Sequence, residues 1–424
     1  MFETNKIAQG VNVHVHQTTQ FKTINFSIRF KDRLTVKNAS ERAILANVLQ
    51  HSNEIYPSHT ALRMVLDDLY GTSLYIDSTK RGDDHIVNLN VETVNDQYLS
   101  DKGVLEKVLN LMYIALFKPN LENGLFKESI FKREQESIVQ RIESIIDDKT
   151  RYAQQRMMEL GLPDHPASIN SNGSIEQVKQ VTNESLVAAY KNMLETNEVE
   201  IYVVGDVAPE VITSHIRDYF RFSNRKQLPE KTQSQLQTPE QSRVLEYEDM
   251  KQGKLHMMFF TPVTFRDEDF PVMQVLNGVF GGYAHSKLFA NIREKESMAY
   301  YVSSSYASQF GLMFVLAGID RKLEEKAVSL ILDQLNEIKQ GHITDTEVEQ
   351  TKALLSNQLK EALDSARGQI DIYDQYMELA EDFEPAYLIE RWEKVTKEQI
   401  AQAAKNMSLQ LTYFLSGKED ASDE

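Results

Sequence analysis

The sequence contains no cysteine. This excludes disulfide bonds and thiolate metal sites, and it is typical of a protein in a reducing compartment, so we predict a cytoplasmic location. No segment reaches the run of about eighteen apolar residues that crosses a bilayer. The first residues also lack the basic and apolar regions of a signal peptide. We therefore predict neither a membrane span nor a secretory leader.

Positive charge is also scarce. The 46 Lys and Arg residues are outnumbered by 63 Asp and Glu residues, which gives a net charge of −17. Nucleic-acid binding relies on clustered Lys and Arg, so we expect no nucleic-acid partner. The hydrophobic content of 41% is typical of a globular protein, and 424 residues exceed one ordinary core.

One helix-to-strand pattern occurs twice along the chain. Residues 181–193 and 395–407 both begin Val-Thr-x-Glu and end Lys-Asn-Met, and a β-rich segment follows each. Each Thr is predicted to cap its helix. A helix followed by a strand hairpin is likewise predicted in both halves. These repeats predict two homologous domains, residues 1–223 and 244–424, joined by a polar, Gln-rich linker at 224–243.

The first domain contains the outline of a zinc-peptidase helix. Residues 44–51 have an amphipathic helical pattern that ends Asn47-Val48-Leu49-Gln50-His51. An inverted zinc motif, His-x-x-Glu-His, needs a second imidazole and a general-base carboxylate on this helix. Asn47 and Gln50 stand at those two positions, and an amide cannot act as a general base. Only His51 remains of the motif.

Residues 267–305 carry a longer signature. They combine a helix that ends in a Gly-rich loop, a Ser-x-Leu-Phe helix, Arg-Glu-Lys, and an Ala-Tyr pair that starts a strand. In this order they closely resemble the C-terminal domain of the pitrilysin/insulinase family of zinc peptidases. Together with the degenerate helix, the resemblance covers essentially the whole chain. It is strongest to the short two-domain branch, and there to the zinc-less partner subunits of Gram-positive bacteria.

The resemblance implies an α+β fold. Each of the two domains is expected to hold a mostly antiparallel sheet of about six strands packed with helices. The two domains together are expected to form half of a clamshell. In the family the third zinc ligand is a Glu on a later helix, seven residues after another acidic residue. Aligned in this way, the ligand position holds Arg141, and Glu134 precedes it by seven residues.

Several observations argue against zinc on this chain. A guanidinium repels a divalent cation, so Arg141 is not a ligand. Glu143 replaces it only in a register shifted by two residues, which rotates a helical side chain by about 200° onto the wrong face. His14 and His16 share a face of a probable strand, but two imidazoles alone form a weak site, and we expect a solvated edge there. We predict no cofactor on this chain and zinc on a partner subunit.

The resemblance also assigns residues in the second half. Arg293 and Tyr300 match positions that the family uses in catalysis, where Tyr can hydrogen-bond the oxyanion and Arg can hold a substrate carbonyl. The alternative is an Arg–Glu surface pair and an ordinary strand Tyr. Gly281 and Gly282 can end a helix or let a substrate backbone approach closely, and Tyr283 continues this loop. These three are candidate substrate-binding residues.

Three functions are compatible with this sequence. The resemblance favours a partner subunit of a heteromeric peptide-processing metallopeptidase, which acts on a peptide beside a homologous zinc-bearing subunit. A non-catalytic peptide-binding or assembly protein, which takes up an extended peptide on a sheet edge, is the second. A self-sufficient metalloendopeptidase with unusual ligands is the third. A homodimer of the isolated chain is compatible with all three.

Overall fold

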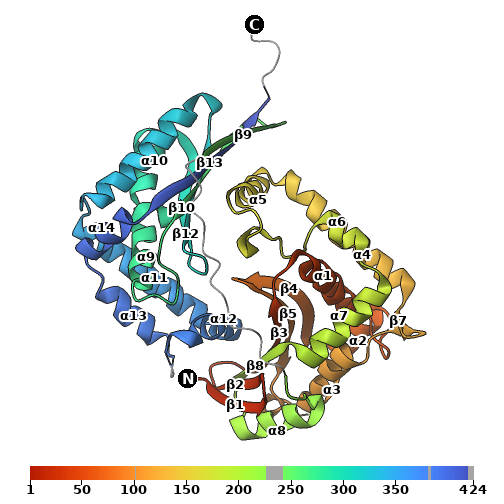
Figure 1. Ribbon diagram of the computed structural model, residues 1–424. Helices are drawn as coiled ribbons and strands as arrows, with labels where there is room; N and C mark the ends of the chain where they lie inside the picture. Colours follow the sequence, from red (N-terminus) through yellow and green to blue (C-terminus); the bar gives the residue numbers. More distant parts are fainter. Residues whose placement is uncertain (101, 226–241, 381–382, 419–424) are drawn as a thin grey trace. The chain divides into compact units, whose positions relative to one another are not determined.

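The computed structural model describes residues 1–100, 102–225, 242–380 and 383–418 (Figure 1). Most of the predicted linker, residues 226–241, lies outside these ranges. No helix within them combines the length and apolarity that a membrane span requires. The contacts divide the described chain into two units, residues 1–144, 169–225 and 363–375 in unit 1 and the remainder in unit 2. Two segments therefore belong to the unit on the other side of the linker.

Unit 1 contains a six-stranded sheet in the order β1-β2-β8-β3-β5-β4. Its strands are β1 (Glu3–Ala8), β2 (Val11–Gln17), β3 (Thr23–Arg33), β4 (Ser73–Arg81), β5 (Asp84–Val94) and β8 (Glu198–Gly205). β2 and β8 run parallel, and the other neighbours are antiparallel. β1 and β4 are the edge strands.

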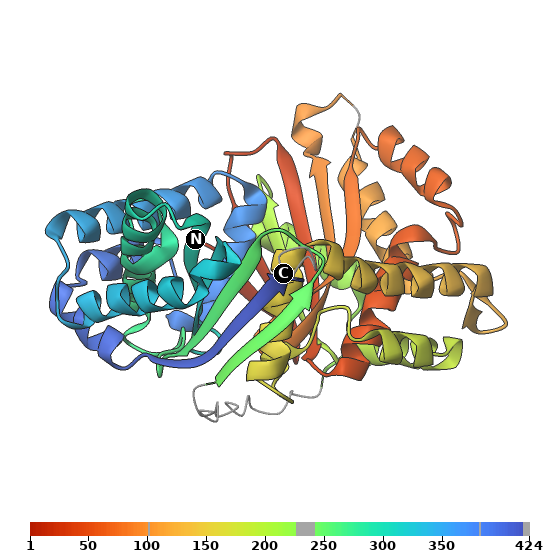
Figure 2. The same ribbon diagram turned by 90° about the horizontal axis from the view of Figure 1, so that it is seen from above.

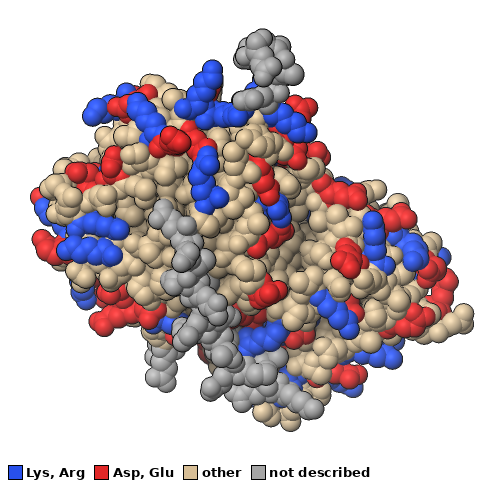
Figure 3. Space-filling view, turned by 45° about the horizontal axis from the view of Figure 1, so that its top comes forward, with Lys and Arg blue, Asp and Glu red and all other residues tan. Residues whose placement is uncertain are grey.

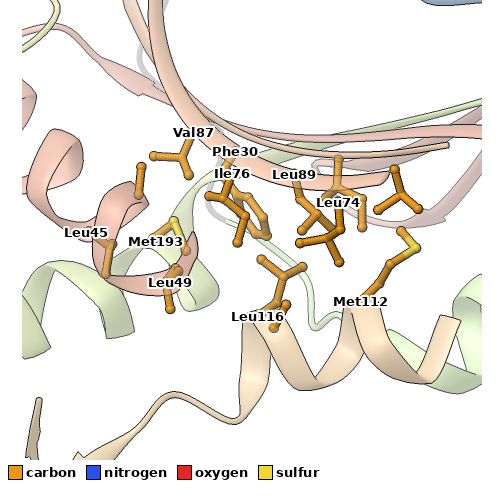
Figure 4. Packing of buried hydrophobic residues seen from close by; sticks show 14 of the residues in the cluster. Phe30, Leu45, Leu49, Leu74, Ile76, Val87, Leu89, Met112, Leu116 and Met193 are labelled. Atoms are coloured by element: carbon orange, nitrogen blue, oxygen red, sulfur yellow. The ribbon is translucent and has the colours of Figure 1, made fainter. Parts of the chain in front are cut away.

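Helices cover one face of this sheet. They include α1 (Val36–His51), α2 (His59–Asp68), α3 (Val104–Phe117), α4 (Glu128–Glu143), α6 (Ile175–Gln180), α7 (Asn183–Thr196) and α8 (Pro209–Phe220). Leu45 and Leu49 of α1 belong to the buried cluster drawn in Figure 4, together with Phe30 of β3. Asn47 and His51 lie two residues further along, about 200° around the helix. Packing of the leucines thus directs these two side chains away from the sheet.

The other face of the sheet is polar and is covered by α12 (Ala366–Tyr376) (Figure 1). The carboxylate of Asp374 on α12 forms ion pairs with Arg29 and Lys31 of β3 and with Arg81 of β4. The hydroxyl of Tyr202 on β8 also donates to it, at 2.5 Å. The Asp374 side chain is fully buried. Three ion pairs and one hydrogen bond to a single buried carboxylate therefore connect α12 to three strands.

Unit 2 contains a five-stranded sheet in the order β11-β12-β10-β13-β9. Its strands are β9 (Ser242–Glu248), β10 (Gly253–Phe260), β11 (Ala299–Ala307), β12 (Leu312–Ile319) and β13 (Ser408–Gly417). β13 and β9 run parallel, and the other neighbours are antiparallel. Figure 2 shows the blue β13 between the green β9 and β10. The order and directions repeat those of β4-β5-β3-β8-β2 in unit 1.

The sheet of unit 2 also has helices on both faces. On one face, α9 (Phe270–Asn277) contacts β11, and the helices α13 (Ala386–Glu393) and α14 (Lys397–Lys405) pack on α9. Helix α10 (Glu324–Lys339) packs on α14 and is followed along the chain by α11 (Asp345–Leu363). On the other face, α5 (Lys149–Gly161) contacts β10 and β13. Met258 of β10 packs with Met157 of α5. The neighbouring Phe259 contacts Phe280, with ring centroids 6.4 Å apart. Strand alternation thus gives each side of the sheet its own core.

The fold class predicted from the sequence is confirmed: both sheets are mostly antiparallel, with six and five strands. The predicted helix caps are present too. Thr182 accepts a hydrogen bond from the backbone N of Ser185, and Thr396 from that of Gln399, each within a capping box. On the face drawn in Figure 3, acidic and basic side chains of the described residues intermingle.

Candidate functional site

Helices α1 and α4 bring four of the sequence-predicted residues together. Asn47 and His51 lie one turn apart on α1, and Glu134 and Arg141 lie two turns apart on α4. His51 Nδ1 is 3.2 Å from Glu134 Oε1. Arg141 Nη2 donates to Asn47 Oδ1 at 3.5 Å, whereas Glu143 is exposed. We call these four residues the α1–α4 site.

Glu134 is the buried acid of this site, and its side chain is 3% exposed. Besides its contact with His51, it accepts a hydrogen bond from Arg133 Nε at 2.7 Å. Burial alone would raise the pKa of Glu134, but hydrogen bonds from His51 and Arg133 outweigh burial and hold that pKa below its usual value. The Glu134 carboxylate is therefore ionised at neutral pH, hydrogen-bonded to Arg133 and within ion-pair distance of His51.

Gln50 contacts strand β4, whereas Asn47 and His51 contact helix α4. Its Oε1 accepts a hydrogen bond from the backbone N of Ile76, on edge strand β4. Because an amide oxygen accepts hydrogen bonds without taking up a proton, Gln50 can hold this strand but cannot activate a water. The contact also occupies one of the backbone N–H groups that an edge strand offers to an incoming peptide.

The donor set of the α1–α4 site does not fit zinc. A catalytic zinc site needs three nitrogen, oxygen or sulfur ligands around an open position for water. Here Arg141 carries a positive charge, Asn47 presents its amide oxygen to that charge, and His51 faces Glu134. Within the described ranges, no group of three or more His, Asp and Glu side chains is placed to hold a metal ion. The α1–α4 site therefore supports no metal-dependent step.

The two strand histidines lie elsewhere in unit 1 and contact separate partners. His14 Nε2 is 2.7 Å from Glu200 Oε2, and His16 Nδ1 is 2.8 Å from Gln369 Oε1. The expectation of a solvated edge is wrong for His14, which is only 2% exposed. Its position on a strand was predictable, but the helix that covers this face, α12, comes from a distant part of the chain.

In unit 2, Tyr300 lies at an irregularity of edge strand β11. Ala299 pairs with Ile319 and Tyr301 with Gly318, so Tyr300 is the extra residue of a β-bulge. A bulge re-aims the side chain that it carries. The Tyr301 ring packs against Gly318, whereas Tyr300 is 74% exposed. The Tyr300 hydroxyl is thus open to a binding partner.

Arg293 lies on the π-helical segment η5 (Phe289–Lys295), which precedes β11. Its Cζ is 4.7 Å from the centroid of the Phe289 ring. Among the residues that the structure describes, it forms no ion pair, and the nearby Glu296 binds Lys326 instead. The alternative of an Arg–Glu surface pair therefore does not describe Arg293.

The Gly-rich loop has contacts of its own inside unit 2. A Cβ at Gly281 would lie 2.7 Å from both Leu288 Cδ1 and Ser304 N, so close packing requires glycine there. A Cβ at Gly282 would lie 3.0 Å from Asn277 Nδ2. The Tyr283 hydroxyl donates to Gln358 Oε1 at 2.7 Å. A substrate-binding role for Gly281, Gly282 and Tyr283 stays a prediction.

Sequence reasoning missed two features of unit 1. It did not find the contact between Gln50 and Ile76, for which the sequence carries no signal. It also missed the charged network around Asp374. The polar residues Ser27, Arg29 and Lys31 alternate with apolar ones along β3, and this pattern could have indicated that both faces of the strand are covered.

Comparisons with known proteins agree with this geometry. Residues 180–355 match the family described as Peptidase M16 inactive domain. The probable inactive metalloprotease YmfF of Bacillus subtilis is 36% identical over 414 residues, 97% of each chain. A conserved protein from Enterococcus faecalis V583 is 32% identical in its crystal structure, with a TM-score of 0.90 over 99% of this chain and 100% of that one. A peptidase M16 inactive domain from Pseudomonas fluorescens shares the fold at 17% identity, with a TM-score of 0.78 over 99% and 98% of the two chains.

Proposed function

This chain belongs to the pitrilysin/insulinase family of peptidases, family M16, and we propose that it is a subunit without a metal that assists cleavage on a zinc-bearing partner. The observation that carries the proposal is a contrast within one chain. The zinc positions are replaced by Asn47, Gln50 and Arg141, whereas Arg293 and Tyr300 are present. A chain that retains only the second pair can bind or polarise a peptide but cannot activate water.

The chemistry of the second pair suits a helper role in trans. A phenol that is 74% exposed can donate a hydrogen bond to the oxyanion of a tetrahedral intermediate. A guanidinium that lies against the Phe289 ring can still use its N–H edge for a substrate carbonyl. We propose these roles for Tyr300 and Arg293, with a peptide as the substrate and a homologous chain as the source of zinc.

A second candidate is peptide binding without cleavage. Edge strand β11 can take up an extended peptide as an added strand, which needs no metal. The two candidates differ in their effect on cleavage. A binding protein captures peptide and leaves the cleavage rate of a zinc-bearing homologue unchanged, whereas a helper subunit raises that rate.

The test is a reconstitution. The purified chain is mixed with a homologue from the same cell that has an intact His-x-x-Glu-His motif, and cleavage of quenched fluorescent peptides is followed. We expect no cleavage by this chain alone and cleavage by the mixture. Tyr300→Phe should lower kcat of the mixture by about 100-fold, the usual effect of losing one oxyanion donor. Tyr247→Phe, at another exposed tyrosine of unit 2, should leave kcat unchanged.

Two results would contradict the proposal. An unchanged kcat for the mixture with Tyr300→Phe would remove the catalytic role of that hydroxyl. Stoichiometric zinc on the purified chain, measured by elemental analysis, would instead support a self-sufficient enzyme with unusual ligands. Because Tyr300 is largely exposed and only its hydroxyl is removed, a folding defect does not complicate the comparison.

A further inference from the structure

The α1–α4 site offers hydrogen-bond donors at positions where a metal centre would offer lone pairs. A cation is held by groups that offer lone pairs. Two of the zinc positions here hold Asn47 and Arg141, whose side-chain N–H groups are hydrogen-bond donors. A cluster of donors around a positive charge is suited to an anion.

The charge of Arg141 is not neutralised by a neighbour. Its guanidinium donates to Asn47 Oδ1 at 3.5 Å and to Asn172 Oδ1 at 3.4 Å, both near the upper limit for a hydrogen bond. Across the described part of the chain, it forms no ion pair. The nearest acid of the site, Glu134, is already paired with Arg133, whose Nη2 lies 2.6 Å away. The positive charge of Arg141 is therefore not balanced by a carboxylate of this site.

The site is also open on one side. Arg141 is exposed, and the His51 side chain is 34% exposed. Asn47 and Glu134 are nearly buried, with exposed fractions of 9% and 2%. His51 Nδ1 faces Glu134 at 3.2 Å, so the Nε2 atom on the other side of the ring is the one that can face a ligand. An anion could thus reach Arg141 and His51 without any change in the packing of α1 on α4.

We infer that the α1–α4 site binds a carboxylate, with Arg141 as its main ligand and His51 beside it. The planar guanidinium matches a carboxylate in geometry and can donate two parallel hydrogen bonds to it. The carboxylate can be the C-terminus of a peptide or an Asp or Glu side chain, because both present the same group. The site lies in unit 1 and requires no partner subunit, although the use of peptides as probes rests on the proposed function.

The competing interpretation is purely structural. In that case Arg141 replaces the lost zinc charge only to hold α4 against α1 through Asn47. Replacement of Arg141 would then lower stability but would not change any preference among peptides. Binding selectivity, rather than binding alone, therefore separates the two interpretations.

The experiment measures this selectivity by isothermal titration calorimetry with the full chain. Three N-acetylated pentapeptides of Ala, Leu and Ser are compared: one with a free C-terminal carboxylate, one with a C-terminal amide, and one amide in which a single Ser is replaced by Glu. We expect at least one carboxylate peptide to bind about fivefold more tightly than the neutral amide, a modest effect typical of an exposed charge pair. Which carboxylate peptide binds more tightly identifies the source.

Three variants complete the design. Arg141→Gln should abolish the preference, and Arg141→Lys should retain part of it, which shows that the loss is not one of folding. Arg217→Gln, at an exposed position of α8, removes the same charge elsewhere in unit 1 and should keep the full preference. Equal affinities for all three peptides, no measurable binding of any of them, or a preference that survives Arg141→Gln would each overturn the carboxylate site. Tyr300→Phe should leave the preference intact, so failure here is distinct from failure of the reconstitution.

Discussion

Replacing Asp374 with Asn tests how α12 is held on the sheet of unit 1. The Asp374 side chain is fully buried, whereas its partners Arg29, Lys31 and Arg81 are 3%, 16% and 29% exposed. Asn preserves the shape and the acceptor for the Tyr202 hydroxyl but removes the charge. Removing one partner of a buried ion pair typically costs about 3–5 kcal/mol, because the opposite charge stays buried without compensation. We expect Asp374→Asn to lower the free energy of unfolding by that amount.

A matched control lies one turn earlier on the same helix. Asp371 also pairs with Arg29, at 2.5 Å, but its side chain is 44% exposed. Exposed pairs contribute at most about 1 kcal/mol, so Asp371→Asn should have a small effect. The assay is urea unfolding, combined with hydrogen exchange of the α12 amides so that unit 1 is followed separately from unit 2. A loss below about 1 kcal/mol for Asp374→Asn, or equal losses for both variants, would refute the reasoning.

The same network predicts a dependence on pH. Burial alone would raise the pKa of Asp374, but the charges of Lys31, Arg29 and Arg81 outweigh it and hold that pKa well below its usual range. A carboxyl whose pKa is lowered by folding stabilises the protein above its unfolded-state pKa of about 3.9. This stabilisation declines as the pH falls from there toward the lower folded-state pKa. The difference in unfolding free energy between wild type and Asp374→Asn should therefore shrink as the pH falls from about 4 downward.

The remaining predictions concern the α1–α4 site and the Gly-rich loop. The triple change Asn47→His, Gln50→Glu and Arg141→Glu restores a complete set of zinc ligands and a general base, so we expect about one zinc per chain by elemental analysis, against none for wild type. If the triple variant still binds no zinc, the backbone of α1 and α4 no longer matches that of a metal centre. Gly281→Ala places a methyl group 2.7 Å from Ser304 N and should lower stability by about 1–3 kcal/mol in thermal unfolding. An unchanged Tm would indicate that the loop yields and that packing does not require glycine there.

Much of the fold could be predicted from the sequence because short sequence patterns specify helices, strands and helix caps. The alternation of Phe26, Ile28 and Phe30 marks a strand face, and a Thr before a helix marks its start. The repetition of the capped helix before β8 and β13 was sufficient to predict two similar units. The loss of the zinc ligands was also readable, since residue type alone decides whether a side chain can bind a cation.

The candidate site was only partly readable. Resemblance placed Arg293 and Tyr300, but the bulge that exposes Tyr300 depends on its register with β12. The two-residue repeat of a strand does not show where one strand gains an extra residue relative to its neighbour. The contact of Gln50 with Ile76 likewise depends on where the end of α1 meets the edge of β4.

The sequence by itself determined the class of fold, the internal repeat and the replacement of the zinc-motif residues by Asn47, Gln50 and Arg141, because each follows from residue types and short spacings. Only the tertiary structure decided which groups meet. Arg29 pairs with Asp374 across 345 residues, and Arg141 meets Asn47 across 94. Such pairs form because sheet order and helix packing bring distant segments together, and no local pattern specifies the partner of a buried charge.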